Sequence, residues 1–377
     1  MQGYDVAIVG GGITGLAHAH SAAKRGLKVV VVEQNSKPIG ASVRNFGLVL
    51  PLAQLPGKNL DLALKSYAIW KEVLVEFGIW NKPNGLLVLG LNELETRVMQ
   101  EFVSAIANMG YGAIQYLNRD EIEAYSPGAF NLSAIQGALY SPAETTINPV
   151  ETVKKLAIGL HEKYGVDFRY NTIVKSFYQN KIETNKGPVE AERILLCTGE
   201  AYEQFYPELY TGLALQKCKL QMLRLQVPPN WQLNQAVASG ISMLHYSSFT
   251  AAPSLQKLKE YYNHYYPELE RNGIHILAVE NNRGELLIGD SHKYSEHDFE
   301  PGDSAEINKI ILDWVQQYLN LPQTNIIETW HGVYLKSMSD SIYTRLAPAN
   351  NIRIVTAVGG QGMTISFGVA EETFEGW

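Results

Sequence analysis

Cysteines, long apolar runs and basic clusters are all scarce in this chain of 377 residues. The two cysteines, Cys197 and Cys218, form neither a CxxC pair nor a disulfide framework, which indicates a reducing, cytoplasmic setting. No apolar run reaches the ~18 residues that a membrane span needs, and the first expected strand begins too near Met1 for a signal peptide. A net charge of -7 without a basic patch argues against a nucleic-acid partner.

Recognisable metal-ligand spacings are also missing. The nine histidines and the acidic residues show no ligand pattern, so the sequence predicts no metal site. A chain of this length exceeds one ordinary hydrophobic core, so we expect two domains. The sequence is therefore that of a water-soluble globular protein whose function must be sought in its glycine-rich turns.

The strongest pattern in the chain lies at its beginning. The β-branched run Val6–Val9 leads directly into the Gly-x-Gly-x-x-Gly segment 10–15, which predicts a buried strand, a sharp turn and a helix. A second apolar strand, 27–32, ends at Glu33, 18 residues after Gly15 and close to the ~20 expected of a dinucleotide fold. Strand, glycines, helix and acid together predict a dinucleotide site, with Glu33 accepting hydrogen bonds from ribose hydroxyls.

The remaining chain predicts an α/β fold with an α+β second domain. Apolar strands at 193–199 and 352–358 belong with the first strand in a parallel sheet, whereas alternating residues at 217–227 and the strands 274–280 and 286–288 suggest an antiparallel one. Helices are expected over 60–77, 92–109, 149–164 and 310–319. We therefore expect a discontinuous Rossmann-like domain, 1–85, 140–212 and 328–377, and a substrate domain with a mainly antiparallel sheet, 86–139 and 213–327.

Two further glycine turns bear on which dinucleotide is bound. Thr198-Gly199 and Gly359–Gly362 each end an apolar strand, and strand ends in open α/β sheets form the ligand crevice. Three such turns suit one long ligand, which favours a flavin dinucleotide, and a nicotinamide-dependent dehydrogenase remains the alternative. The helix expected to begin near Met363 would point its N-terminus at the charge that develops on a reduced flavin ring.

These segments occur in an ordered set that covers nearly the whole chain. Together with Leu139-Tyr140, Asn148-Pro149, Leu287–Asp290 and Trp330-His331-Gly332, they resemble the FAD-dependent amine and amino-acid oxidoreductases. That family includes glycine oxidase, sarcosine oxidase and D-amino acid dehydrogenase. The stretches Ala41–Gly47 and Gly289–His292 resemble a narrower branch proposed to oxidise aminophosphonates.

The resemblance implies a reaction and a cofactor. Flavin N5 would take hydride from a carbon bearing a neutral amine, giving an imine that hydrolyses to a carbonyl, with oxygen or a quinone as electron acceptor. The FAD would be non-covalent, because no histidine lies between His20 and His161 and no cysteine follows Cys218. The expected cofactor contacts are Gly10, Gly12, Ile13, Thr14, Gly15, Glu33, Gln34, Ser42, Val43, Arg44, Asn45, Gly47, Leu48, Val174, Thr198, Gly199, Gly359, Gly360, Gly362, Met363 and Thr364.

The substrate residues are less clearly marked. Relatives place an arginine two residues after the glycine of Trp-x-Gly, where it binds a substrate carboxylate, and Tyr334 stands there in this chain. Lys336 either holds an anionic group as a point charge or is solvated, and a non-catalytic flavin-binding subunit stays a third reading. The candidates for catalysis are His245, Tyr246, Tyr334 and Lys336, and those for binding a small anionic amine are Arg44, His245, Tyr246, His292, Tyr334, Lys336 and Gln361.

Overall fold

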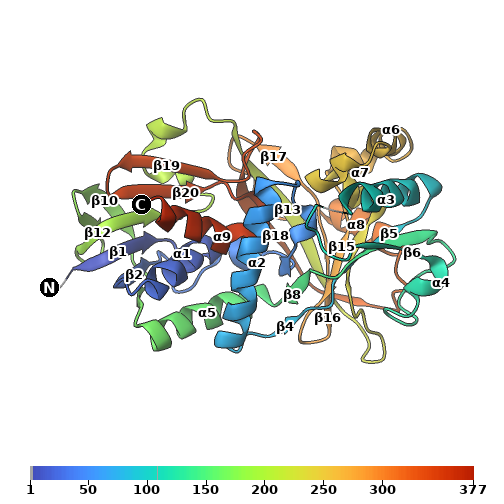
Figure 1. Ribbon diagram of the computed structural model, residues 1–377, viewed down its shortest axis with the longest axis horizontal. Helices are drawn as coiled ribbons and strands as arrows, with labels where there is room; N and C mark the ends of the chain where they lie inside the picture. The colour runs from blue at the N-terminus through green and yellow to red at the C-terminus, as the bar shows by residue number, and fades with distance from the viewer. Residues whose placement is uncertain (1–2, 108) are drawn as a thin grey trace.

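The N-terminal β-branched run forms the centre of an eight-stranded sheet in the computed structural model, which describes residues 3–107 and 109–377 (Figure 1). Strand β1 (Tyr4–Val9) is fully paired on both sides, because its buried residues Val6–Val9 can face helices on either surface. The five central strands of the sheet run parallel, in the order β9 (Asp167–Arg169), β2 (Val29–Val32), β1, β12 (Val189–Leu196) and β20 (Ile352–Thr356). Strands β10 (Val174–Tyr178), β11 (Lys181–Thr184) and β19 (Thr344–Ala349) extend it antiparallel.

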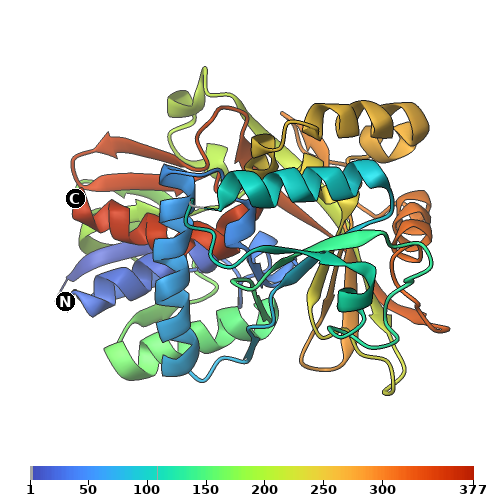
Figure 2. The ribbon, with the colours of Figure 1, turned by 45° about the vertical axis from the view of Figure 1, so that its right-hand side comes forward.

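Helix α1 (Ile13–Lys24) lies beside the sheet, between α9 (Gly362–Glu375) and α5 (Pro149–Tyr164) (Figure 1). Alanines at 17, 19, 22 and 23 let α1 approach its neighbours closely. Helix α2 (Lys58–Glu76) crosses over α9 at the junction of the two halves, as Figure 2 shows. Its fully buried Trp70 donates an indole hydrogen bond of 2.6 Å to the carbonyl of Met363. The start of α9 is therefore held in place by α2.

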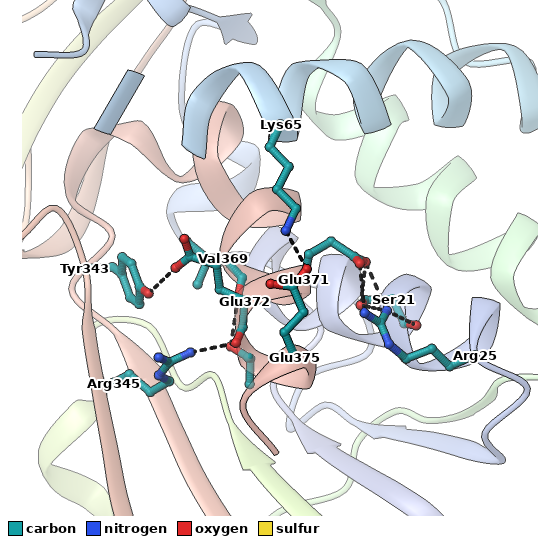
Figure 3. Close-up of polar contacts among 10 residues, drawn as sticks. Ser21, Arg25, Lys65, Tyr343, Arg345, Val369, Glu371, Glu372 and Glu375 are labelled. Carbon is teal, nitrogen blue, oxygen red and sulfur yellow. Dashed lines mark hydrogen bonds and ion pairs between the residues drawn. The ribbon is translucent and has the colours of Figure 1, made fainter. Parts of the chain in front are cut away.

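Charged and polar side chains fix the other end of α9 (Figure 3). Both oxygens of Glu371 accept from Arg25, which directly follows α1, at 3.1 and 2.9 Å, and Ser21 of α1 donates to the same carboxylate at 2.6 Å. Lys65 of α2 pairs with Glu375 at 2.7 Å, and Tyr343 donates to Glu372 at 2.7 Å. A bidentate arginine fork adds geometric restraint as well as energy. The helix whose first turn follows the C-terminal glycines is thus tied to both α1 and α2.

The second half of the molecule is built on a nine-stranded sheet, mostly antiparallel. Its longest pair joins β13 (Leu215–Gln226) to β18 (Asn325–Ser337), and the remaining strands are β5 (Leu86–Gly90), β6 (Gln115–Asn118), β7 (Gly137–Ser141), β14 (Ala236–Ser239), β15 (Leu277–Glu280), β16 (Glu285–Gly289) and β17 (Lys293–Ser295). Its helices are α3 (Glu93–Ile106), α4 (Arg119–Ile122), α6 (Leu255–Tyr265), α7 (Pro267–Arg271) and α8 (Ala305–Val315). A small third sheet, β3 (Leu48–Val49), β8 (Thr145–Ile147) and β4 (Asn81–Lys82), lies at the junction.

The predicted α/β class and the mainly antiparallel second sheet are confirmed. Strand β18 was not predicted, because its first five residues are exposed and show no alternation between buried and exposed positions. The expected domain boundary at residue 328 falls inside β18, whose pairing with β13 runs on to Ser337, and the division into domains stays a prediction. Within the described part of the chain, no helix combines the length and apolarity needed to cross a membrane.

A buried carboxylic acid at the junction should make stability depend on pH. Glu144 is 1% exposed, one of its oxygens accepts from the Leu52 amide at 3.1 Å, and the other has no partner among the described residues. Burial raises the pKa of Glu144 to about 7. Because the unfolded chain ionises at lower pH, this group lowers the free energy of unfolding progressively between about pH 4.5 and pH 7.

We therefore expect Glu144→Gln to flatten part of the pH dependence. Relative to wild type, the variant should gain stability from pH 5 to pH 8, by on the order of a few kcal/mol. Thermal unfolding at several pH values measures this, with the exposed Glu162→Gln as the matched control. Parallel curves for wild type and Glu144→Gln would show that the Glu144 pKa is not raised.

Candidate cofactor and substrate site

The glycine turn sits where three parallel strands end side by side. Val9 of β1 is paired with Val32 of β2 and with Leu196 of β12, so the chain leaves all three strands at one edge. A Cβ on Gly10 would lie 2.3 Å from the carbonyl oxygen of Cys197, and one on Gly15 would lie 2.0 Å from the carbonyl oxygen of Gly10. Gly10 also has a φ of +107°, which disfavours other residues. The turn therefore requires glycine at both positions.

Glu33 stands next to this turn and is 7% exposed. One carboxylate oxygen accepts from the Gly11 amide at 2.9 Å, and the other accepts from the Asn35 amide at 2.9 Å. A carboxylate has about four acceptor positions, so lone pairs remain for ribose hydroxyls. Glu33 thus has a second task that the sequence did not reveal, since it holds the glycine turn itself.

A short loop closes over the start of α1. The Ile13 amide donates to Ser42 Oγ at 2.9 Å, which ties η1 (Ala41–Val43) to the helix N-terminus. Asn45 braces the loop by accepting from the Gly47 amide and donating to the Ala41 carbonyl, both at 2.8 Å. The guanidinium of Arg44 donates to the carbonyls of Ile39, at 2.8 Å, and His331, at 2.9 Å. Arg44 therefore links this loop to β18 of the other half.

A cleft of about 360 Å³ runs from the glycine turn to β18. The expected cofactor residues along it are Gly10, Gly12, Ile13, Thr14, Glu33, Gln34, Ser42, Arg44, Asn45, Val174, Thr198, Gly199, Gly359, Gly360, Gly362 and Met363. Tyr334 lines its far end as expected, whereas Gly332, Val333, Leu335 and residues 355–358 line it without having been predicted. Those segments are strand residues, whose approach to the cleft depends on long-range pairing.

Five expected cofactor residues lie outside the cleft lining, namely Gly15, Val43, Gly47, Leu48 and Thr364. Gly47 supports the site indirectly, because a Cβ there would lie 2.0 Å from the carbonyl oxygen of Ile147. Thr364 Oγ1 accepts from the Leu50 amide at 3.0 Å. In the described structure these residues hold the cleft walls together, and their contact with a cofactor stays a prediction.

At the far end, the C-terminal glycine turn meets β18. Lys336 of β18 forms an isolated β-bridge with Val358, and a Cβ on Gly360 would lie 3.3 Å from the Tyr334 hydroxyl. Burial raises the pKa of Tyr334 well above its ordinary value, so the phenol keeps its proton. Lys336 Nζ lies 3.4 Å from the hydroxyl of Tyr294, and Gln361 pairs with Gln54 through their side-chain amides.

Of the expected substrate residues, only Arg44 and Tyr334 are among the described residues that line the cleft. Lys336 and Gln361 lie outside the lining, and so do His245, Tyr246 and His292, which gather around His275. His245, His275 and His292, called here the histidine cluster, have ring centroids 4.3 to 5.1 Å apart. Burial lowers the pKa of His275 well below its ordinary value and that of His292 to about 4, so both rings are neutral at pH 7. His275 was not predicted as a site residue because no local sequence pattern distinguishes it.

The cleft fits a dinucleotide on three observations. The glycine turn admits no side chain at Gly10 or Gly15, α1 begins beside it with first-turn amides that have no partner within the helix, and Glu33 keeps free acceptor positions. The cleft then continues past Thr198-Gly199 to a second helix N-terminus at Gly362, which suits a ligand longer than one nucleotide. Fold and site together fit a protein that binds a long dinucleotide.

The family is given by comparison with known proteins. Residues 5–375 match the family model of FAD dependent oxidoreductases, and the chain belongs to that family. The chain is 27% identical over 242 residues to a bifunctional protein ThiO/ThiG of Trichormus variabilis, an alignment that covers 59% of this chain and 34% of that protein. It is 28% identical over 253 residues to a D-amino acid dehydrogenase of Helicobacter pylori, covering 52% of this chain and 60% of that one.

A solved structure shows the same fold. Glycine oxidase from Geobacillus kaustophilus superposes with a TM-score of 0.79 at 20% identity, covering 100% of this chain and 94% of that one. The alignments with curated relatives span about a third to three fifths of those proteins. The expected FAD cofactor agrees with the family, and the particular residues that contact it are proposals of the geometry above.

Glu33→Gln should weaken FAD binding. The substitution turns one acceptor into a donor that faces a backbone amide, at either Gly11 or Asn35, and leaves one amide without its partner. An unmatched donor costs about 1–3 kcal/mol, which corresponds to roughly a tenfold to hundredfold weaker dissociation constant. Titration of apoprotein with FAD measures this, with the exposed Glu192→Gln of the same sheet as control. Equal affinities in all three proteins would contradict this role.

Proposed function

We propose that this protein oxidises the C–N bond of a small amine that carries an anionic group, either an amino acid or an aminophosphonate. Bound FAD would supply the hydride acceptor, and the chain would bind and orient the substrate. Membership of the FAD dependent oxidoreductases supports a redox role, and two of the similar proteins are named glycine oxidase and D-amino acid dehydrogenase. Their substrates are small, charged amines.

The proposal that the substrate carries an anionic group rests on Tyr334 and Lys336, which lie on one face of β18. Residues two apart on a strand share a face, and these two lie against Gly360 and Gly359 of the C-terminal turn. Arg44 is the one arginine among the described residues that line the cleft, and its guanidinium is engaged by two backbone carbonyls. Lys336 is outside the cleft lining, but its Cγ would lie 3.7 Å from a Cβ on Gly359, which lines the cleft. We therefore assign Lys336 to the substrate anion, as a point charge rather than a fork.

The direct test is anaerobic reduction of the bound flavin. Glycine, sarcosine, D-alanine and 2-aminoethylphosphonate are added separately, and we expect at least one to bleach the flavin absorbance, whereas ethylamine should not. If dithionite bleaches the flavin and none of the anionic amines does, the proposal is wrong. A protein without flavin would instead favour the nicotinamide alternative, and turnover only with a partner would favour the non-catalytic subunit.

Lys336→Met should raise the KM for the anionic substrate by roughly tenfold to a hundredfold and leave FAD occupancy unchanged, because a hydrogen bond to a charged group contributes about 1.5–3 kcal/mol. Steady-state kinetics and flavin absorbance measure the two quantities. Lys309→Met, on the exposed face of α8, is the matched control, and Lys336→Arg should recover part of the affinity. A rise in KM accompanied by a fall in FAD occupancy would instead assign Lys336 to the cofactor.

A further inference from the structure

The histidine cluster is assembled from three separate parts of the second half. His245 follows η5 (Gly240–Leu244), His275 precedes β15, and His292 follows β16. One nitrogen from each ring lies within 4.8 Å of the others. The backbones of His275 and Asp290 are hydrogen-bonded to each other, at 3.2 and 2.8 Å, which places the Asp290 side chain among the rings. Gly289 lies against Phe46, so the cluster adjoins the proposed cofactor loop.

Hydrogen bonds at the far side of two rings decide where their protons sit. Ser242 Oγ donates to the Ile276 carbonyl at 3.1 Å, so it can only accept from His275 Nδ1, 3.2 Å away. The Gly273 carbonyl, 3.1 Å from His292 Nδ1, is likewise only an acceptor. Both Nδ1 atoms therefore carry hydrogen in the neutral rings, and both Nε2 atoms carry lone pairs.

These lone pairs face a carboxylate. Asp290 Oδ1 lies 3.1 Å from His275 Nε2, and Oδ2 lies 3.7 Å from His292 Nε2. Asp290 is 4% exposed, and its Oδ1 has no hydrogen-bond donor within the described part of the chain. When Asp290 is ionised, four acceptor atoms converge without a donor between them. Burial raises the pKa of Asp290 well above its ordinary value, so without an ion the carboxyl group keeps a proton, and a bound cation would replace that proton.

We propose that His245, His275, His292 and Asp290 bind one divalent transition-metal ion, of the kind that imidazole and carboxylate ligands suit, such as Zn²⁺. His275 and His292 would bind through Nε2, with Ser242 and Gly273 orienting the rings from behind as outer partners do in metal sites. Metal–nitrogen bonds of ~2.1 Å require the three nitrogens to draw closer together. His245 can supply most of that movement, since it is exposed and its side chain makes no hydrogen bond among the described residues.

The charge of such a centre has a consequence for the substrate. A divalent ion with three neutral imidazoles and one carboxylate keeps a net charge of about +1. The Tyr294 ring is stacked on His292 with centroids 6.4 Å apart, and Lys336 Nζ lies 3.4 Å from the Tyr294 hydroxyl, so the ion and the lysine would attract one anion together. The ion would thereby add positive charge beside Lys336, in a chain that has Tyr334 at the position where relatives have an arginine. This consequence rests on the proposed function, whereas the metal site itself does not.

The experiment uses the intact flavoprotein, stripped of metal with a chelator and then titrated with Zn²⁺ alone. We expect one Zn²⁺ per chain and a rise in Tm on binding, with the affinity reduced by more than about tenfold in His245→Ala and in His292→Ala. The control is His264→Ala, an exposed histidine of α6 outside the cluster. Flavin absorbance and the Tm of the metal-free protein report whether each variant folds. If His292→Ala does not fold, the test rests on His245→Ala, because His245 is exposed.

Zn²⁺ affinity that is absent in wild type, or unchanged in both cluster variants, would overturn the proposal. The two proposals fail separately. Flavin bleaching by an anionic amine without Zn²⁺ binding would remove the metal site and leave the proposed function intact. Stoichiometric Zn²⁺ binding without bleaching by any anionic amine would do the reverse.

Discussion

The site depends on the close approach of the backbone at three positions: Gly10, which follows β1, Cys197, which follows β12, and Gly15, in α1. The carbonyl of Cys197 occupies the space where Gly10 would carry a side chain, and the carbonyl of Gly10 does the same for Gly15. This contact sets the direction in which α1 leaves the sheet, and so aims the helix N-terminus along the cleft. Glu33 then fixes the turn by accepting from Gly11.

The far end of the cleft depends on different interactions, which join the two halves. Trp70 and the Arg25–Glu371 pair hold α9, so the glycine turn before it keeps its place. Arg44 joins the cofactor loop to the His331 carbonyl of β18. Consequently the loop, the C-terminal turn and the face of β18 that carries Tyr334 and Lys336 come together as one wall. The dinucleotide end is thus shaped by local steric contacts, and the substrate end by contacts distant in sequence.

That difference explains what could be predicted from the sequence. The Gly10–Gly15 segment and Glu33 were recognisable because their spacing is local and their residue types have a steric or hydrogen-bonding reason. The long strand β18 was missed because its first half is exposed. His275 was missed, and no metal was expected, since 245, 275 and 292 are brought together only by the pairing of β15 with β16 and the position of η5. The hydrogen bond from Arg44 to the His331 carbonyl of β18 was likewise evident only from the structure.

We infer that the crowded glycine turn forms the FAD site, and one substitution tests this inference. Gly15→Ala forces a Cβ against the Gly10 carbonyl, whereas Gly3→Ala adds the same group at an exposed position with 3.6 Å to its nearest neighbour. Each purified protein is titrated with FAD. We expect about one FAD per chain for wild type and Gly3→Ala, and less than about a tenth of that for Gly15→Ala. Full FAD occupancy in Gly15→Ala, or none in wild type, would contradict it.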